Sequence, residues 1–440
     1  DLDSVSGIAL LAGSAGTGKT YTVKALINKR LTTNTTFREV AATATTHKAA
    51  SVLSKQIDFP VTTIHSFLGL VVRDNYATGT QFLNKETETE NDHVGLLIID
   101  EASMIDANLL KHILEAQDVD GFSILFVGDN CQLPPVEDDP LLFDEFSHVK
   151  HTLTKIHRQG AKNPIIQLAN GYRDVILGTT STYPEVKTAR SDEGKTEGVF
   201  VVDESKFQDL ITQACQSGSD YTGRYKILAF RNEVVNRFNS FAREACYKNR
   251  AVEASVFVGE RFVVNSPVVK DTAVVLRNEE DVTVLRADKD NVLHGVRHTI
   301  VHVSPSHVPE YEQRANPVVC RVPYDWREVE AAVAPHRARA TELARKIKKL
   351  KGDATKFNLV KALDQKRRDA WGEFFQIKRE FADIRPPFSS TVHKSQGSTF
   401  ETVFIDFGDL MRCRDTDVRD RLIYTAITRA SKRVLINGGL

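Results

Sequence analysis

The sequence predicts an α/β protein in which two parallel-sheet domains each carry an insertion. Short, largely apolar segments alternate with helix-forming segments through residues 1–150, as buried parallel strands and their connections do. The same alternation starts again near His151 and is interrupted by residues 251–323, where Val and Thr recur in the short alternations typical of antiparallel strands. It resumes at Arg385. A chain of 440 residues is also too long for a single hydrophobic core.

The apolar segments that predict the two sheets are well separated along the chain. In the first sheet they are Ile8–Leu11, Val40–Ala44, Gly95–Ile99 and Ile124–Val127. In the second sheet they are Ile227–Phe230, Thr402–Asp406 and Val434–Ile436. We therefore expect the first sheet domain in residues 1–68 and 93–150, an inserted hairpin in 69–92, the second sheet domain in 151–250 and 384–440, and a second insertion in 251–383.

The two insertions differ in character. Residues 69–92 hold two β-prone pieces around a turn rich in Asn, Thr and Gly, which predicts a hairpin. Residues 251–323 predict a small antiparallel β-barrel, and residues 325–383 are helix-forming and basic. Between Arg337 and Arg368 there are twelve Lys and Arg against three Asp and Glu. A solvated helical face is the ordinary meaning of such a run, and contact with nucleic acid is the alternative.

The composition is that of a globular protein with no strong overall charge. Lys plus Arg and Asp plus Glu both number 58, so a polyanion must be met by a local cluster of charge. The five cysteines form no CxxC pair, which argues against a zinc module or a disulfide framework and favours a reducing, cytoplasmic location. An apolar run of membrane-spanning length and a signal peptide are both absent from the sequence. Because the first residue is Asp1 and not Met, we expect the natural N-terminus to lie upstream.

The segment GSAGTGKT is the strongest chemical signal. It follows the predicted strand Ile8–Leu11 and precedes a helix-forming segment from Tyr21 to Asn28, which is the context that a phosphate-binding loop requires. Glycines let successive backbone N–H groups and the helix N-terminus face a bound triphosphate. Lys19 adds a cation near the β- and γ-phosphates, and Thr20 adds a hydroxyl for Mg²⁺. The predicted nucleoside-triphosphate-binding residues are Gly13, Ser14, Ala15, Gly16, Thr17, Gly18, Lys19 and Thr20.

Two further segments place polar side chains at strand ends. Asp100 and Glu101 follow the predicted strand Gly95–Ile99, where Asp100 would hold Mg²⁺ through water and Glu101 would orient or deprotonate an attacking water. A strand-end turn that happens to be acidic is the alternative. The segment GDNCQLPPV follows the strand Ile124–Val127, and its Gln132 could reach the γ-phosphate.

Eight segments taken in order carry a resemblance to a known family. They are GSAGTGKT, TTHKAA, TIHSF, IIDEAS, GDNCQLPPV, LTKIHRQ, TVHKSQGSTF and YTAITRA. Together they resemble the superfamily 1 helicases and, within them, the RecD/Dda-like group 1B. The resemblance covers nearly the whole chain. It implies two RecA-like domains that enclose one ATP, an inserted SH3-like barrel with a helical tower, and 5′-to-3′ movement on single-stranded DNA.

The resemblance also implies roles for single residues. Lys19, Thr20, Asp100, Glu101 and Gln132 match the phosphate and Mg²⁺ residues of the first domain. Arg158 and Arg429 match two arginines of the second domain that reach the γ-phosphate across the cleft, where a positive charge stabilises the transition state of phosphoryl transfer. The implied partners are single-stranded DNA, its junction with duplex, and a single-strand-binding or replisome protein, and the implied state is a monomer.

Residues that match the single-strand contacts of such enzymes lie in both domains. They are Thr45, His47, Thr63, His65, Pro134, Thr391, His393 and Lys394. A structural histidine is the alternative for each His, and a capping or turn role is the alternative for Thr45 and Thr63. The hairpin matches the strand-separating pin, and we select Phe82 over Tyr76 as the residue that stacks on the junction. Packing of Phe82 onto its own domain remains open.

One part of the family pattern falls outside the sequence. The family has a glutamine upstream of the phosphate loop that reads adenine, and the chain begins after that point. Selection of ATP is therefore an expectation from the resemblance. Two other functions stay open: an RNA translocase of the related Upf-like group, and a nucleic-acid-binding protein with an inactive nucleotide site.

Overall fold

The computed structural model describes residues 7–33, 39–86, 91–135, 149–155, 163–191, 194–216, 221–248, 256–270, 273–306, 308, 316–350 and 354–438. The chain divides into two compact units. The first comprises Asp1–Gly69, Thr87–Cys246 and Phe388–Leu440, and the second comprises Leu70–Glu86 and Tyr247–Pro387. Among the helices that the structure describes, none has the length and apolar character needed to cross a bilayer.

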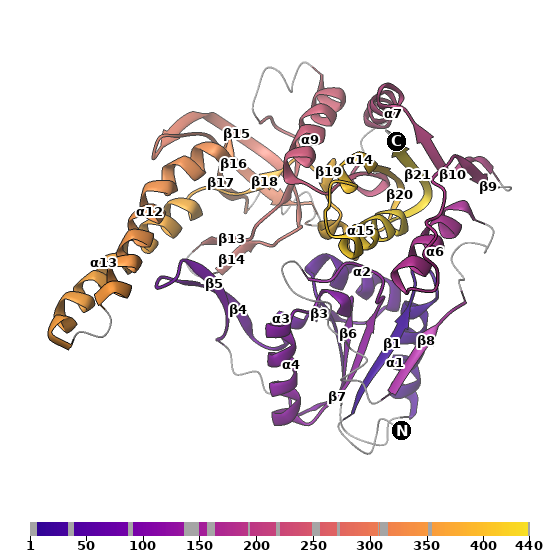
Figure 1. Ribbon diagram of the computed structural model, residues 1–440, viewed down its shortest axis with the longest axis horizontal. Helices are drawn as coiled ribbons and strands as arrows, with labels where there is room; N and C mark the ends of the chain where they lie inside the picture. Colours follow the sequence, from indigo (N-terminus) through magenta and orange to yellow (C-terminus); the bar gives the residue numbers. More distant parts are fainter. Residues whose placement is uncertain are drawn as a thin grey trace. The chain divides into compact units, whose positions relative to one another are not determined.

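The first sheet of unit 1 has six parallel strands in the order β3-β2-β6-β7-β1-β8 (Figure 1). Their bounds are β1 Ile8–Gly13, β2 Glu39–Ala44, β3 Val61–Thr63, β6 Val94–Asp100, β7 Ser123–Gly128 and β8 Val149–Leu153. The helices are α1 Lys19–Thr33, α2 His47–Ile57, α3 Ile64–Phe67 and α4 Ala107–Asp120, with a short 3₁₀ turn, η1 Ala102–Met104. We call this sheet and its helices the first lobe.

Local chemistry fixes the ends of these helices. Thr46 and Asp106 cap α2 and α4, because each side chain accepts a hydrogen bond from the backbone N–H three residues on, at 3.1 and 2.7 Å. Helix α4 ends at Gly121, whose φ of 70° suits glycine. Valine, leucine and isoleucine side chains of the strands pack against α1 and α2 in one buried cluster. The lobe therefore presents the carboxyl ends of its strands at one well-fixed edge.

Strand β8 corrects the expected boundary between the two sheet domains. We expected the second domain to begin at residue 151, but His151 and Thr152 pair in parallel with Leu11 and Ala12 of β1. The strand is a largely exposed edge strand with the sequence VKHTL. It has no apolar run that would mark it as a strand, so the sequence pattern did not reveal it.

The second sheet of unit 1 has the order β19-β11-β20-β21-β10-β9 (Figure 1). All neighbours are parallel except β10 and β9. The strands are β9 Ala189–Ser191, β10 Gly194–Val202, β11 Tyr225–Ala229, β19 Ser389–Thr391, β20 Phe400–Ile405 and β21 Ala430–Asn437. The helices are α6 Pro164–Ile176, α7 Glu204–Gln216, α8 Tyr221–Arg224, α9 Asn232–Tyr247, α14 Phe407–Leu410 and α15 Thr416–Thr428, with the 3₁₀ turn η3 His393–Ser395. This sheet and its helices are the second lobe.

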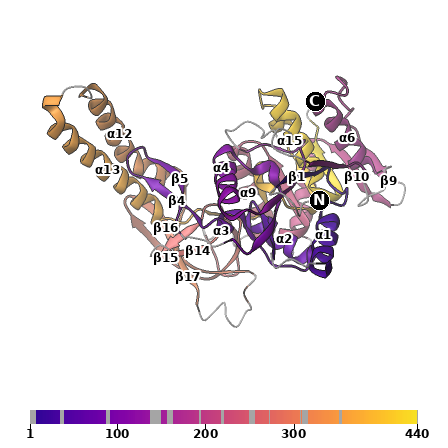
Figure 2. The same ribbon diagram turned by 90° about the horizontal axis from the view of Figure 1, so that it is seen from below.

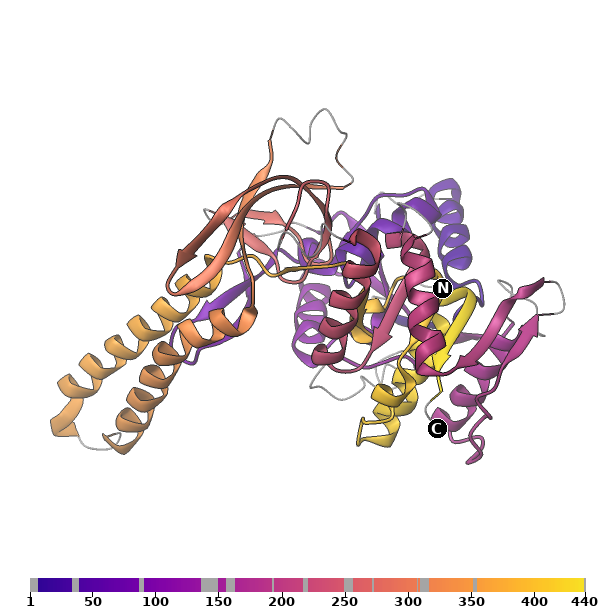
Figure 3. The ribbon, with the colours of Figure 1, turned by 90° about the horizontal axis from the view of Figure 1, so that it is seen from above.

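Unit 2 contains an antiparallel sheet in the region where the barrel-like insertion was expected. Five strands run in the order β17-β16-β15-β12-β18, and the sheet is curled in Figure 3. Their bounds are β12 Arg261–Val264, β15 Asp281–Leu293, β16 Val296–Pro305, β17 Val318–Pro323 and β18 Ile384–Arg385, and a separate ribbon is formed by β13 Val268–Lys270 and β14 Ala273–Leu276. The inward-facing valines Val282, Val284, Val301 and Val303 are fully buried, which explains the Val-rich alternation in the sequence.

Two long helices and one hairpin complete unit 2. Helices α12 Trp326–Leu350 and α13 Phe357–Arg379 lie side by side, as Figure 2 shows, and we call them the tower. The hairpin consists of β4 Leu70–Asn75 and β5 Thr80–Lys85, as expected for residues 69–92. Its turn approaches the tower so closely that a Cβ at Gly79 would lie 2.3 Å from the Trp371 ring. Glycine is required there for this reason and for its φ of 77°.

Candidate active site

The phosphate loop connects β1 to α1 at the carboxyl edge of the first sheet. Gly16 and Gly18 have φ values of 81° and 92°, which glycine adopts without strain. The Thr17 hydroxyl donates to the carbonyl of Ser14 at 2.8 Å, which closes the loop on itself. The ammonium group of Lys19 lies over the same loop, 2.7 Å from the Gly13 carbonyl and 3.2 Å from the Ser14 carbonyl. A cation is thus held at the centre of a backbone cradle that ends at a helix N-terminus.

The acidic pair lies at the end of β6, in the middle of the same sheet edge. Burial and the neighbouring carboxyl of Glu101 raise the pKa of Asp100 to about 7. Glu101 has a φ of 54° and a ψ of 41°, a left-handed conformation that a glutamate rarely adopts. Strained residues of this kind concentrate at functional sites. Two adjacent carboxylates at a strand end fit a divalent cation, because hard oxygen ligands are those that Mg²⁺ prefers.

Several buried polar atoms in this region lack a hydrogen-bond partner within the described part of the chain. They include side-chain oxygens of Ser14, Ser103 and Gln132 in the first lobe and of Ser398 and Thr425 in the second. Buried polar groups in native proteins are paired with protein, water or ligand in most cases. Five such oxygens from the predicted nucleotide motifs of both lobes are therefore consistent with a polar ligand between the lobes.

The turn after β7 joins the two lobes of unit 1. Its Cys131 and Leu133 are buried in the hydrophobic core of the second lobe, among Ile165, Leu422 and Tyr424. The Asp129 carboxylate accepts the backbone N–H of Cys131 at 3.1 Å and the hydroxyl of Tyr424, from α15, at 2.7 Å. This turn also positions Gln132, so the conformation of a first-lobe residue depends on α15 of the second lobe.

Two more side chains of the second lobe bind the same turn. Arg421, one helical turn before Tyr424, donates to the carbonyls of Asn130 and Gln132. Gln396 donates to the carbonyl of Leu133 at 3.0 Å. A Cβ added at the neighbouring Gly397 would lie 3.1 Å from Ala49 and 3.9 Å from Glu101. The TVHKSQG and YTAITRA segments of the second lobe therefore both contact the catalytic edge of the first.

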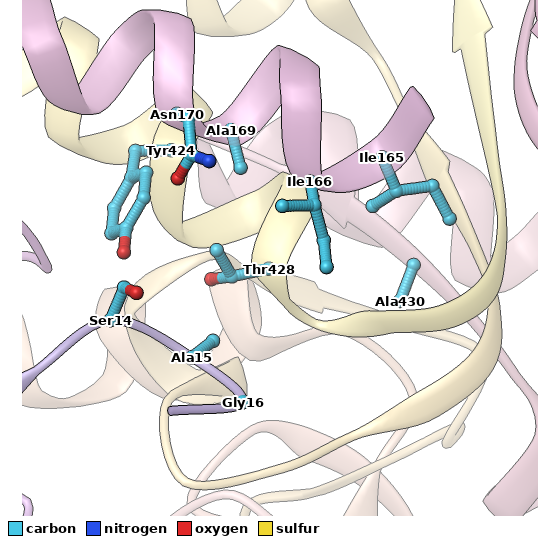
Figure 4. A pocket seen from close by; sticks show the side chains of 10 residues that line it. All are labelled: Ser14, Ala15, Gly16, Ile165, Ile166, Ala169, Asn170, Tyr424, Thr428 and Ala430. Carbon is cyan, nitrogen blue, oxygen red and sulfur yellow. The ribbon is translucent and has the colours of Figure 1, made fainter. Parts of the chain in front are cut away.

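A narrow pocket marks where the phosphate loop faces the second lobe (Figure 4). Ser14, Ala15 and Gly16 form one wall, α6 forms another, and Tyr424, Thr428 and Ala430 form the third. In Figure 4 the Tyr424 hydroxyl is directed toward Ser14. The pocket holds about 40 Å³, whereas ligand sites commonly hold roughly 300 to 1,000 Å³. The lobes must therefore separate at this wall before a nucleotide can enter through it.

Arg429 lies at the end of α15, between the pocket residues Thr428 and Ala430. Its side chain is 5% exposed and donates to the carbonyls of Thr425 and Ser398, at 3.2 and 3.3 Å. These bonds hold a permanent positive charge next to the wall that faces the phosphate loop. The second expected arginine, Arg158, lies outside the described residues.

Comparisons with known proteins agree with this two-lobed geometry. A family model described as an AAA domain matches residues 2–183, and a model described as the UvrD-like helicase C-terminal domain matches residues 388–436. The chain is 27% identical to the ATP-dependent DNA helicase dda of Enterobacteria phage T4, over 95% of this chain and 91% of that protein. The chain belongs to the superfamily 1B helicases.

Two further relatives extend the comparison. The ATP-dependent RecD2 DNA helicase of Deinococcus radiodurans is 36% identical over 39% of this chain and 22% of that protein. A crystal structure of Pif1 helicase from Bacteroides in complex with ADP-AlF3 and ssDNA overlays with a TM-score of 0.49, at 15% identity, over all of this chain and 90% of that one. The RecD2 match is confined to a minority of both chains.

The residues expected to contact a single strand in this helicase lie at the carboxyl ends of β2, β3 and β19. Thr45 and His47 follow β2, Thr63 and His65 lie at the end of β3, and Thr391, His393 and Lys394 follow β19. Strands β2 and β3 are three and four neighbours away from β1, which puts roughly 14 to 19 Å between the first-lobe members of this group and the phosphate loop. The first sheet thus carries two distinct functional regions on one edge.

The local bonding of these residues varies. Thr63 is 5% exposed and its hydroxyl caps α3 through Ser66, whereas Thr45 contacts the Met104 sulfur at 3.4 Å and the cap of α2 is Thr46. Burial lowers the pKa of His65 and of His393 below the usual value, so both imidazoles are neutral at pH 7. Neutral imidazoles can still donate a hydrogen bond to phosphate. Pro134 is half-buried beside the turn that joins the lobes.

Sequence reasoning did not assign roles to Asp129, Tyr424, Arg421 and Gln396. Asp129, Gln396 and Tyr424 lie in segments that were recognised and Arg421 lies just before one, but no periodicity or spacing connects residue 129 with residue 424. Only the fold brings Asp129 and Tyr424 together, so the sequence could reveal the motifs that contain them but not the contact between them.

The Tyr424 hydroxyl is expected to stabilise the lobe contact. Tyr424→Phe removes a buried hydrogen bond to a carboxylate, which costs about 1.5 to 3 kcal/mol of unfolding free energy. The shift in urea midpoint measures this. Tyr183→Phe is a matched control, because that hydroxyl also donates to a carboxylate, Asp420, at 2.8 Å but belongs to a side chain that is 47% exposed. An equal loss in both variants would contradict a special role for Tyr424.

Proposed function

We propose that this protein is an ATP- and Mg²⁺-dependent DNA helicase that moves 5′ to 3′ on single-stranded DNA and separates duplex. The observation that carries the proposal is the seam between the two lobes. The phosphate loop and Gln132 of the first lobe meet α15 of the second lobe there, and Glu101 of the acidic pair lies beside Gly397 of the second lobe. A protein that only bound nucleic acid would have no need for the groups that hydrolyse a triphosphate.

The residues at the seam have complementary chemical tasks. Lys19 and the backbone N–H groups of the loop bind the β- and γ-phosphates, and Glu101 orients the attacking water for in-line displacement. Thr20 and Asp100 are the residues that would hold Mg²⁺, which supplies neutralisation of phosphate charge when bound. Gln132 and Arg429 approach the transferred phosphate from the two sides of the seam, with Arg158 as a third proposed contact. The charge that develops in the transition state is stabilised by these groups only while the lobes are closed.

Movement follows from the position of the two functional regions. Hydrolysis followed by release of the inorganic phosphate removes the negative charge that the second-lobe arginines bind, so the closed state loses stability and the lobes separate. Because the single-strand residues lie on both lobes, at β2 and β3 of the first and at β19 of the second, each opening changes the spacing of the two groups along the strand. If the two lobes bind the strand tightly in turn, one in the closed state and the other in the open state, repeated closing and opening produces directed movement along the single strand.

The hairpin of unit 2 is the proposed strand separator. Tyr76 packs edge-on against Phe375 of α13, with ring centroids 5.8 Å apart, and Asp74 pairs with Arg379. Within the described residues Phe82 makes no ring contact of this kind, and it is 44% exposed, so its face is available to a base. These contacts favour Phe82 over Tyr76 as the residue that stacks on the junction.

Phe82→Ala is therefore expected to lower the unwinding rate by about tenfold, since stacking of a base on an aromatic side chain is worth about 1 to 3 kcal/mol. The ATPase rate stimulated by single-stranded DNA is expected to stay within about twofold, because the strand path on unit 1 is untouched. Stopped-flow unwinding of a fluorescent fork measures the first rate. Leu83→Ala, the next residue of the same strand, serves as the control. A parent-like unwinding rate in Phe82→Ala would remove Phe82 from this role.

The proposed polarity and substrate are tested with tailed duplexes. The protein is expected to unwind a duplex with a 5′ single-stranded tail and to leave a duplex with a 3′ tail intact. DNA oligonucleotides are expected to stimulate ATP hydrolysis more than RNA oligonucleotides of the same sequence. Preference for the 3′ tail would refute the 5′-to-3′ assignment, and stronger stimulation by RNA would favour an RNA translocase.

A further inference from the structure

The far half of the tower concentrates positive charge in a chain that is neutral overall. We define the distal tower surface as residues 339–350 of α12 together with residues 354–368, which lead into and begin α13. These residues carry ten Lys and Arg and only two acidic residues, Glu342 and Asp364. The whole chain has 58 of each sign. An excess of this size in so short a stretch creates a local positive field.

The near half of the same two helices provides an internal comparison. Residues 326–338 and 369–379 carry four Lys and Arg and four Asp and Glu. Most of these charges pair with one another, as in Arg337 with Glu330, or with unit 2 neighbours, as in Arg379 with Asp74. The near half shows that these helices can be solvated with equal numbers of basic and acidic side chains. The excess is confined to the distal half, so helix solubility alone does not account for it.

The two distal carboxylates are already neutralised inside the tower. Glu342 pairs with Lys346 at 2.6 Å, and Asp364 pairs with Arg367 and Arg368. Seven distal cations remain and all are exposed; within the described structure six of them make no ion pair, and these are Arg339, Arg345, Lys348, Lys349, Lys361 and Lys366. Leu343 and Ile347 are buried, so the apolar side of α12 faces inward. The cations are left as an outward-facing surface that lacks a counter-charge.

We propose that the distal tower surface binds the phosphate backbone of duplex DNA ahead of the junction. The inference rests on the proposed function, because a helicase at a fork always has a duplex, the densest available polyanion, next to its strand separator. The contacts of Tyr76 with Phe375 and of Asp74 with Arg379 fix the hairpin to α13 within unit 2. The surface therefore moves with the hairpin as one body.

The length of α13 sets where the duplex would be held. Lys361 precedes Phe375 by fourteen residues, which is about 21 Å along a helix that rises about 1.5 Å per residue. This corresponds to roughly six base pairs at about 3.4 Å each. The surface is thus placed to hold the duplex about half a turn beyond the hairpin. A fork with a shorter duplex would not reach it.

The test uses the 440-residue chain and DNA forks that have a 5′ tail and a duplex stem closed by a loop. The stem is about 4 or about 16 base pairs long, so that the short stem ends before the estimated position of the surface and the long stem passes it. The variant is Lys348→Glu, Lys349→Glu and Lys361→Glu combined. The control carries the same change of charge on exposed lysines of unit 1, Lys55→Glu, Lys111→Glu and Lys206→Glu. Dissociation constants are measured by fluorescence anisotropy over a range of salt concentrations.

The parent and the control are expected to bind the long stem about tenfold tighter than the short stem. The variant is expected to lose this gain in affinity. For the long stem, the slope of log binding constant against log salt concentration is expected to fall in magnitude by about two to three units, since each phosphate contact contributes about 0.9. Affinity for bare single strands and the ATPase rate that they stimulate are expected to match the parent. Circular dichroism of variant and control confirms that both tower helices form.

Three results would overturn the inference. The variant could bind the long stem as tightly as the parent does, which would show that the distal cations are solvated and do not contact the duplex. The variant could lose as much affinity for a bare single strand as it loses for the long stem, which would show that the surface binds single strands. The parent's gain could require a second, 3′ tail on the fork, which would assign the surface to the displaced strand. If the parent bound stems as expected but failed to hydrolyse ATP with single-stranded DNA, the proposed function would fail while the duplex contact stood.

Discussion

Lys19→Ala is expected to lower kcat for ATP hydrolysis by at least about 10²- to 10³-fold, the loss seen when one preorganised charge or donor is removed from a transition state. The ammonium group lies 2.7 and 3.2 Å from the Gly13 and Ser14 carbonyls, inside the loop that would surround the β- and γ-phosphates. Its removal takes away the cation nearest the transferred group. A coupled-enzyme ATPase assay with saturating single-stranded DNA measures the rate.

Lys24→Ala is the matched control for this prediction. Lys24 lies on the same helix, α1, and its ammonium group donates to the carbonyl of Gln56, on α2. Its replacement is expected to change kcat by less than about twofold, as surface substitutions usually do. Single-strand affinity is expected to persist in Lys19→Ala, because the first-lobe strand residues lie roughly 14 to 19 Å from the phosphate loop along the sheet edge. Hydrolysis at the parent rate in Lys19→Ala would remove the role assigned to this lysine.

Arg429→Lys is expected to slow hydrolysis by about 10³- to 10⁵-fold, the range associated with an arginine that stabilises phosphoryl transfer. Lysine keeps the charge but lacks the planar, branched group that donates to both the Thr425 and Ser398 carbonyls. The charge is then no longer held at the pocket wall. Because the arginine acts on the transition state, ATP affinity is expected to change much less than the rate.

Arg433→Lys is the matched control for Arg429. Arg433 lies four residues further along, on β21, and donates to the Thr402 hydroxyl at 3.1 Å. This bond lies within the second sheet and makes no contact with the first lobe. The control is expected to retain parent-like hydrolysis, and thermal unfolding of both variants separates a rate effect from a loss of fold.

Much of unit 1 could be predicted because its signals are local. A buried parallel strand must be apolar along its whole length, so β1, β2, β6 and β7 were visible as runs of apolar residues. The phosphate loop and the acidic pair were visible because their chemistry needs fixed residue types next to a strand end. The exposed strand β8 lacked such a run, and for that reason the boundary at residue 150 was wrong.

The contacts between the lobes could not be predicted in the same way. Whether Gln132 is held in place depends on Asp129, and Asp129 depends on Tyr424, which lies 295 residues further along the chain. No pattern in one sequence records such a pairing. The same limit applies to the hairpin, where the choice between Phe82 and Tyr76 rests on the packing of Tyr76 against Phe375. The resemblance supplied roles for residues, and the fold supplied the partners that hold them.

The central claim is that one triphosphate is hydrolysed by groups from both lobes. Arg429 tests it most directly, because it is the proposed γ-phosphate arginine that lies within the described residues. The decisive measurement is rapid-quench single-turnover hydrolysis by Arg429→Lys at saturating ATP and oligonucleotide, together with the ATP dissociation constant. We predict a chemical step slowed by at least about 10³-fold with ATP affinity within about tenfold of the parent. A chemical step within about tenfold of the parent would show that the first lobe hydrolyses ATP without Arg429, and would contradict the account.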